Sequence, residues 1–189
     1  MLFRSTPSCA ARCAAAVLAS LGVGRGDRVA ILCRNRIEFF EIMFACAKLG
    51  AILAPLNWRA PAAELAGLLD DCAPKVLVFS DEYSAQAEAL KRAELASLSI
   101  EKGYEPALAR AEGLDTDHNW PAEATWFLMY TSGTTGQPKG VVQTFQMSAV
   151  NAFHVTQAFG LRGGDTTLNF LPLFHTGGIQ LLTLPTLIA

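Results

Sequence analysis

The polar loop from Thr131 to Lys139 contains the residue types in this sequence that are best suited to chemistry. It reads TSGTTGQPK and combines two glycines, four hydroxyl side chains and one lysine. Glycines let backbone N–H groups approach an oxyanion closely, hydroxyls add further donors, and the lysine adds a positive charge. We therefore predict a loop that cradles a polyphosphate. Its candidate ligands are Thr131, Ser132, Gly133, Thr134, Thr135, Gly136 and Lys139.

Two simpler interpretations of this loop compete with the phosphate cradle. A Walker A loop is excluded, because its pattern G-x-x-x-x-G-K-[ST] does not fit a lysine that follows Pro138 and precedes Gly140. A Thr/Ser/Gly hairpin that binds no ligand explains the composition equally well. The order of the residues, rather than their composition, therefore has to decide between a ligand site and a plain hairpin.

In that order, YTSGTTGQPKGV from Tyr130 to Val141 resembles the phosphate-binding signature of the adenylate-forming superfamily. This superfamily comprises acyl-CoA synthetases, luciferases and the adenylation domains of peptide synthetases. The resemblance implies that the loop holds the β- and γ-phosphates of ATP. It also implies ATP, Mg²⁺ and coenzyme A as substrates or cofactors of a full-length enzyme, which activates a carboxylic acid as an acyl-adenylate and then forms an acyl-CoA. Its catalytic residues are unknown.

A second stretch, LPLFHTGG from Leu171 to Gly178, resembles another core motif of the same superfamily, whose aromatic and histidine side chains line the acyl pocket. A lone histidine is more often a packed core residue, but a position at the carboxyl end of a strand favours the pocket. Two earlier stretches, Gly22–Ile31 and Lys48–Asn57, are similar to the first two strands of the family. The candidate acyl-pocket residues are Phe174, His175, Gly177 and Gly178.

The family resemblance implies more parts than this sequence contains. We expect residues 1–189 to be a truncated N-terminal portion of an AMP-binding, acyl-CoA synthetase-like domain, and we expect the C-terminal lid domain to be absent. No Y-G-x-T-E segment is present, so the chain by itself is expected to be inactive. Two alternatives stay open: a nucleotide-binding or interaction module without catalysis, and the adenylation part of a peptide synthetase. The motif PLFHTGG together with the residues that follow it, Ile179–Pro185, looks more like fatty or aryl acyl-CoA synthetases than like peptide synthetases.

The elements that must position these motifs alternate between apolar runs and helical periodicity. We expect strands at Arg28–Cys33, Ala51–Leu56, Lys75–Ser80, Trp126–Tyr130 and Thr167–Leu171. We expect helices at Ala10–Leu21, Ile37–Leu49, Ala62–Cys72, Asp81–Leu98 and Gln146–Phe159, and a mostly surface connection from Ser99 to Pro121. Repeated strand–helix units predict an α/β fold in which helices cover both faces of a mostly parallel sheet, in three layers.

Composition excludes several other classes of protein. The net charge is −2 with no basic run, so nucleic acid is not expected as a partner. Five cysteines without a CxxC pair indicate reduced thiols in a cytoplasmic protein, and three scattered histidines do not indicate a zinc site. Asp70 and Asp71 are adjacent and therefore point to different sides of a helix, so a solvated helix face is expected there and not a paired-carboxylate site. No apolar stretch reaches the ~20 residues of a membrane span.

The last segment, Gly177–Ala189, contains no charged residue. An exposed apolar patch favours association. We therefore expect this segment to be buried, either within the fold or against a second copy in a homodimer.

Overall fold

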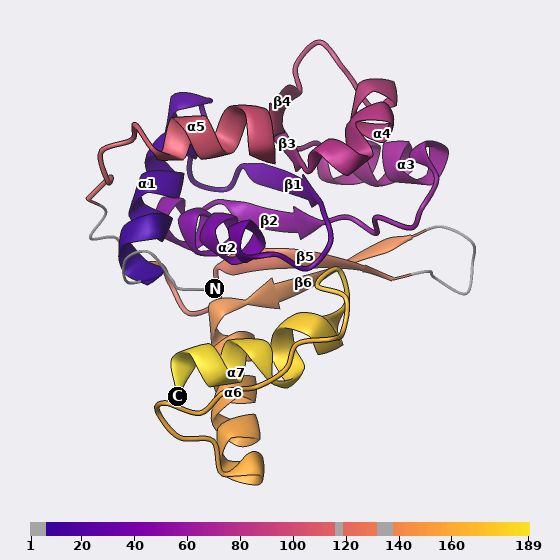
Figure 1. The fold of residues 1–189 in the computed structure, drawn as a ribbon. Coiled ribbons are helices and arrows are strands. Elements are labelled where there is room, and N and C mark those ends of the chain that lie inside the picture. The colour runs from indigo at the N-terminus through magenta and orange to yellow at the C-terminus, as the bar shows by residue number, and fades with distance from the viewer. Residues whose placement is uncertain (1–6, 116–118, 132–137) are drawn as a thin grey trace.

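A single β-sheet organises the computed structural model, which describes residues 7–115, 119–131 and 138–189 (Figure 1). The strand order is β4-β3-β1-β2-β5-β6. All neighbouring strands are parallel except β5 and β6, which form an antiparallel pair. The strands are β1 (Arg28–Leu32), β2 (Ile52–Pro55), β3 (Val76–Phe79), β4 (Ala96–Ser99), β5 (Thr125–Thr131) and β6 (Lys139–Thr144).

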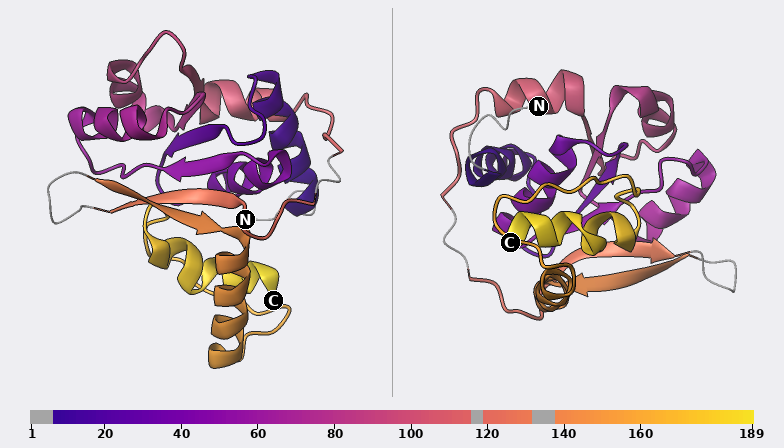
Figure 2. Two further views of the ribbon diagram at one scale, coloured as in Figure 1. Left: turned by 180° about the vertical axis from the view of Figure 1, so that it is seen from behind. Right: turned by 60° about the horizontal axis from the view of Figure 1, so that its bottom comes forward.

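Side chains that alternate along β1 divide the core into two layers. Val29 and Ile31 belong to a cluster with α1 (Pro7–Ser20) and α2 (Ile37–Leu49). Ala30 and Leu32 belong to a second cluster with α3 (Ala62–Cys72) and α4 (Ser84–Ala89). Because successive residues of a strand point to opposite faces, a strand buried on both faces is apolar throughout. The predicted three-layer, mostly parallel arrangement is confirmed (Figure 2).

Helix α2 shows how closely the sequence specifies these elements. It ends at Gly50, whose φ of 65° is left-handed and whose N–H bonds back to the carbonyls of Ala47 and Cys46. A Cβ on Gly50 would lie 2.7 Å from the ring of Trp120, so this position also requires glycine for space. The Trp120 indole N–H donates to the carbonyl of Ala47 at 2.7 Å. That bond fixes the chain shortly before β5 begins.

The segment from Asp81 to Leu98 is not one helix, so that expectation was wrong. It contains a 3₁₀ turn η1 (Asp81–Tyr83), the short helix α4 and then strand β4. Strand β4 pairs with β3 over four residue pairs. Backbone pairing at a sheet edge satisfies the hydrogen bonds of that segment, and it overrides the helical preference of its Ala, Glu and Leu residues.

The connection from Ser99 to Pro121 is also more structured than its glycines and prolines predicted. It contains the π-helical turn η2 (Ile100–Tyr104) and the short helix α5 (Glu105–Leu108). Ile100 and Tyr104 are fully buried in the first core cluster, and the Tyr104 hydroxyl donates to Glu41 at 2.8 Å. Burial of two large side chains makes this segment part of the core.

The last part of the chain comprises α6 (Phe145–Phe159), the π-helical turn η3 (Gly177–Leu181) and α7 (Thr183–Ile188). The expected strand at Thr167–Leu171 is irregular instead. Among the described residues, no strand pairs with this stretch, and an unpaired strand has no partner for its backbone hydrogen bonds. Burial of the uncharged end is partial: Ile179 and Leu184 are buried, whereas Leu187 and Ile188 are exposed.

Candidate functional site

The predicted phosphate loop connects the two antiparallel strands at one edge of the sheet. Thr131 at the end of β5 is the register partner of Lys139 at the start of β6, and both residues are exposed. The two ends of the loop therefore lie side by side at the carboxyl end of β5, where α/β sheets bind ligands. The other predicted phosphate ligands, Ser132, Gly133, Thr134, Thr135 and Gly136, lie outside the described residues.

Tyr130, directly before the loop, is anchored to the body of the domain. Its hydroxyl donates to Asp71 at the end of α3, with an O···O distance of 2.6 Å, and its ring packs on the second core cluster. Burial and the hydrogen bond to Asp71 raise the pKa of Tyr130, so its hydroxyl stays protonated at neutral pH. This contact fixes the strand that leads into the loop. The first residue of the signature was the only signal for it in the sequence.

Asn35 holds the second motif against the carboxyl end of β1. Its side-chain amide donates to the carbonyl of Leu171 at 2.7 Å, and its side-chain carbonyl accepts from the N–H of Leu173 at 3.1 Å. This pair of hydrogen bonds joins residues more than 130 positions apart in the chain. Sequence reasoning missed Asn35, although a polar residue just after a buried strand is a signal that could have identified it.

Phe174 and His175 lie together on the motif that Asn35 holds. Phe174 is buried and meets the ring of Trp58 edge-on, with centroids 6.1 Å apart. The His175 ring lies 4.3 Å from that of Phe174 and is exposed. His175 is therefore not a packed core histidine. Its exposure leaves its ring nitrogens accessible to a ligand at this edge of the sheet.

The two glycines of the motif differ in their surroundings. A Cβ on Gly178 would lie 2.1 Å from the carbonyl oxygen of Pro172, so only glycine allows the two backbones to approach this closely. A Cβ on Gly177 would meet only the side chain of Leu171, at 3.2 Å. Gly177 also lines a shallow apolar depression, together with Leu168, Phe170, Leu171, Leu181 and Leu182. Gly178 therefore serves to shape the turn.

Two arginines flank Trp58, which follows β2. The guanidinium carbons of Arg34 and Arg59 lie 5.0 and 4.6 Å from the centre of the indole ring. Arg34 also pairs with Glu82 at 3.1 Å, whereas Arg59 forms none of the ion pairs found within the described ranges. Cation–π contacts hold both guanidinium groups near the carboxyl edge of the sheet. They add positive charge beside Phe174, a feature that the sequence analysis did not identify.

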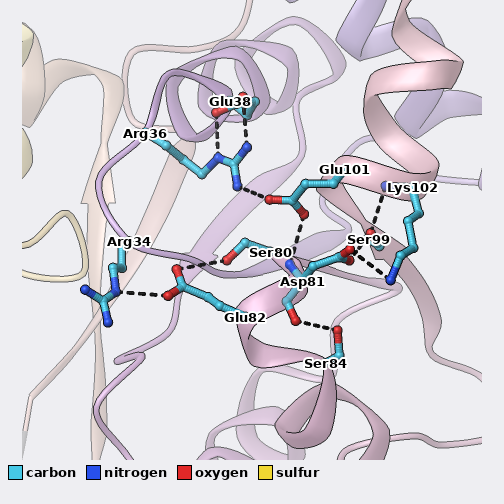
Figure 3. Close-up of polar contacts among 10 residues, drawn as sticks. All are labelled: Arg34, Arg36, Glu38, Ser80, Asp81, Glu82, Ser84, Ser99, Glu101 and Lys102. Atoms are coloured by element: carbon cyan, nitrogen blue, oxygen red, sulfur yellow. Dashed lines mark hydrogen bonds and ion pairs between the residues drawn. The ribbon is translucent and has the colours of Figure 1, made fainter.

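A second polar cluster at the same edge makes its hydrogen bonds and ion pairs among its own residues (Figure 3). Arg36 bonds to Glu38 at 2.6 Å and to Glu101 at 2.5 Å, and Glu101 also accepts the backbone N–H of Asp81 at 2.9 Å. Hydrogen bonds from Ser99 and Lys102 lower the pKa of Asp81. Each carboxylate of the cluster has a donor within the chain, so the cluster ties α2 to β3 and β4.

The adjacent carboxylates of α3 have different partners within the chain. Asp70 pairs with Arg92 at 2.6 Å, while Asp71 accepts from Tyr130. Over residues 7–115, 119–131 and 138–189, no group of three His, Cys, Asp or Glu side chains is placed to hold a metal ion. In that same part of the chain, no helix is long and apolar enough to cross a membrane.

Comparison with known proteins shows the same architecture in carboxylic acid ligases. The chain is 37% identical over 93% of its length to an indoleacetate–CoA ligase of Aromatoleum aromaticum, and covers 36% of that protein. It is 35% identical over 95% of its length to the long-chain-fatty-acid–CoA ligase FadD13 of Mycobacterium tuberculosis, again covering 36%. ATP-bound MatB from Rhodopseudomonas palustris superposes with a TM-score of 0.85 at 26% identity, over 97% of this chain and 37% of that one.

The chain thus spans about a third of the length of the curated relatives that it matches. The family model described as AMP-binding enzyme matches residues 8–189, which is nearly every residue of this chain. That match covers both motifs, from Tyr130 to Gly178. The chain therefore belongs to the AMP-binding enzyme family.

Proposed function

We propose that this chain provides the ATP-phosphate loop and part of the acyl pocket of an acid–CoA ligase. The observation that supports this most directly is the pairing of Thr131 with Lys139. It places a hydroxyl residue and a lysine opposite each other at the carboxyl end of β5, at the two ends of the signature loop. The relatives act on indoleacetate and on long-chain fatty acids, so we propose a fatty or aryl acid as the substrate.

The proposed reaction has two steps. A carboxylate oxygen of the acid attacks the α-phosphorus of ATP, and the bond from that phosphorus to the oxygen bridging to the β-phosphate breaks. Pyrophosphate leaves with the bonding electrons, and an acyl-adenylate remains. The sulfur of the coenzyme A thiolate then attacks the acyl carbon, and AMP leaves. Mg²⁺ would enter with ATP and neutralise part of its phosphate charge.

Residues of this chain would act mainly in the first step. Lys139, Thr131 and the loop between them would bind the β- and γ-phosphates, and their donors would complement the charge that grows on pyrophosphate as it leaves. Phe174, His175 and Gly177 would line the acyl side, at the position set by Asn35. In this proposal residues 1–189 are the N-terminal portion of the catalytic domain, and the lid domain lies outside them.

A second candidate is a nucleotide-binding module without catalysis. The two candidates differ in ATP–pyrophosphate exchange. A binding module would bind ATP but would not incorporate labelled pyrophosphate into it.

The test is ATP–pyrophosphate exchange by the full-length protein that contains this chain, with a panel of fatty and aryl acids. Lys139→Ala removes one charged hydrogen bond to phosphate, and we expect kcat/KM for ATP to fall about 10- to 150-fold. Lys91→Ala is the matched control, because Lys91 is an exposed lysine in a surface ion pair with Glu88. Exchange that is unchanged in Lys139→Ala at limiting ATP would contradict the phosphate-loop assignment.

A further inference from the structure

The end of the β5–β6 hairpin that carries the phosphate loop has few attachments to the rest of the sheet. The register between β2 and β5 contains one residue pair, Leu53 with Phe127, and Figure 1 shows the hairpin extending past β2. Leu128 and Met129 pack against the two core clusters. Among the described residues of 128–131 and 138–143, Tyr130 is the only one whose side chain hydrogen-bonds to another element. The polar attachment of this end therefore depends on Tyr130.

The ring of Tyr130 also covers the backbone of the partner strand. Tyr130 and Gly140 are opposite each other in the register of β5 and β6, and a Cβ on Gly140 would lie 3.4 Å from two carbons of the ring. The ring therefore rests on the residue that directly follows Lys139. An aromatic ring over a cross-strand glycine stabilises such a pair, because the glycine has no side chain of its own to pack there. A contact that fixes this ring thus fixes both strand ends, and with them Thr131 and Lys139.

Asp71 provides that contact. Its carboxylate accepts the hydrogen bond of the Tyr130 hydroxyl at 2.6 Å. Asp71 lies in the last turn of α3, where a negative charge opposes the helix dipole, and that turn contains no basic residue. The charge of Asp71 therefore does not stabilise its own helix. Its favourable interaction is the one that reaches across to β5.

The end of α3 that carries Asp71 is itself fixed to the centre of the sheet. Arg28, the first residue of β1, donates from Nε to the carbonyl of Cys72 at 2.5 Å and from a terminal nitrogen to the carbonyl of Ala73 at 2.8 Å. The side chain of Cys72 is buried in the second core cluster. The bond from Tyr130 to Asp71 therefore ties the hairpin end to a part of the fold that is fixed to a central strand.

We propose that Asp71 is a positioning residue for the phosphate loop. Through the Tyr130 hydroxyl it sets the place of Thr131 and Lys139, and so determines how well their donors meet the β- and γ-phosphates of ATP. Asp71 acts through Tyr130 and takes no part in the chemical step. This inference rests on the proposed function, since it requires a loop that binds these two phosphates.

The experiment measures the Kd for ATP and for AMP by calorimetry, in the full-length protein that contains this chain. A net hydrogen bond corresponds to a factor of about 3 to 10 in an equilibrium constant, so Tyr130→Phe and Asp71→Ala should each raise the Kd for ATP by about that factor. The double variant should bind ATP no more weakly than either single variant, because both changes remove the same bond. Asp71→Asn keeps a carbonyl acceptor and should retain most of the affinity.

Two controls separate positioning from a general loosening of the fold. AMP has no β- or γ-phosphate, so its Kd should stay the same in every variant, whereas a loosened fold would weaken the binding of both nucleotides. Asp70→Ala is the matched control for Asp71→Ala, since Asp70 is the adjacent exposed carboxylate and pairs with Arg92 instead. It should leave the Kd for ATP unchanged.

Three results would overturn the inference: an unchanged Kd for ATP in Asp71→Ala, an equal loss of AMP affinity, or losses that add up in the double variant. If Tyr130→Phe does not fold, Asp71→Ala and Asp71→Asn decide, because Asp71 is exposed. Variants that behave as expected in a protein without ATP–pyrophosphate exchange would refute the proposed reaction and leave the role of Asp71 standing. An unmodified protein that binds no ATP would refute both.

Discussion

The two glycines of the HTGG turn provide a sharp test of the local structure. In Gly178→Ala the new Cβ would lie 2.1 Å from the oxygen and 2.6 Å from the carbon of the Pro172 carbonyl, and 2.9 Å from the Leu171 oxygen. All three atoms belong to the backbone, so the turn must move by more than a side-chain rotation. The carbonyl of Gly178 also accepts from Asn169 at 3.2 Å and from Thr183 at 2.9 Å, and the shift would disturb both bonds.

The expected cost follows from these contacts. Inserting a methyl group into a tightly packed site costs about 1–3 kcal/mol, and backbone atoms place this case in the upper half of that range. For a chain of this size each kcal/mol lowers the melting temperature by about 2–4 °C. We therefore expect Gly178→Ala to melt about 4–12 °C below the unmodified protein, as measured by circular dichroism.

Gly177→Ala is the matched control for this experiment. Its Cβ would meet only the tip of the Leu171 side chain at 3.2 Å, which can move aside. Alanine also has a better helical propensity than glycine, by up to about 1 kcal/mol, so the melting temperature should stay the same or rise slightly. If Gly178→Ala melts at the unmodified temperature, or if Gly177→Ala is the more damaging change, the close approach at Pro172 is not what this turn depends on.

Three further predictions concern the elements around the site. Asn35→Ala removes the exposed hydrogen bond to the Leu171 carbonyl and the half-buried one from the Leu173 N–H, and a loss of about 1–2 kcal/mol should lower the melting temperature by about 2–8 °C. An unchanged melting curve would contradict the role of Asn35 in holding this segment. Burial of Asp27 opposes its charge, but hydrogen bonds from Lys75 and a backbone N–H lower its pKa. Its contribution is therefore present above its unfolded pKa of about 3.9 and is lost as pH falls through the folded value. Asp27→Asn should lower the free energy of unfolding, measured with urea, and this loss should shrink below about pH 4. A loss that stays constant down to about pH 2.5 would refute this reasoning. Residues 1–189 alone should show no ATP–pyrophosphate exchange, and exchange at the rate of full-length relatives would overturn that expectation.

The sequence by itself determined most of the layered fold. Apolar runs predicted β1, β2, β3 and β5, and helical periodicity predicted α1, α2, α3 and α6, with differences of a few residues at their ends. These elements are buried over one or both faces, so the requirement to bury apolar side chains is visible in the local pattern. The signature from Tyr130 to Val141 indicated the family through its resemblance to the phosphate-binding motif of that family, and the family match over residues 8–189 confirms the family.

Only the tertiary structure decided how distant segments meet. Strand β4 exists because β3 offers its edge, the hydroxyl of Tyr104 is buried because Glu41 accepts its hydrogen bond, and Asn35 acts through a segment more than 130 residues away. Thr167–Leu171 shows the converse case, a strand pattern that pairs with no strand in the described part of the chain. Periodicity reports which face of an element is apolar. It does not report which partner completes the backbone hydrogen bonds, since that partner comes from elsewhere in the fold.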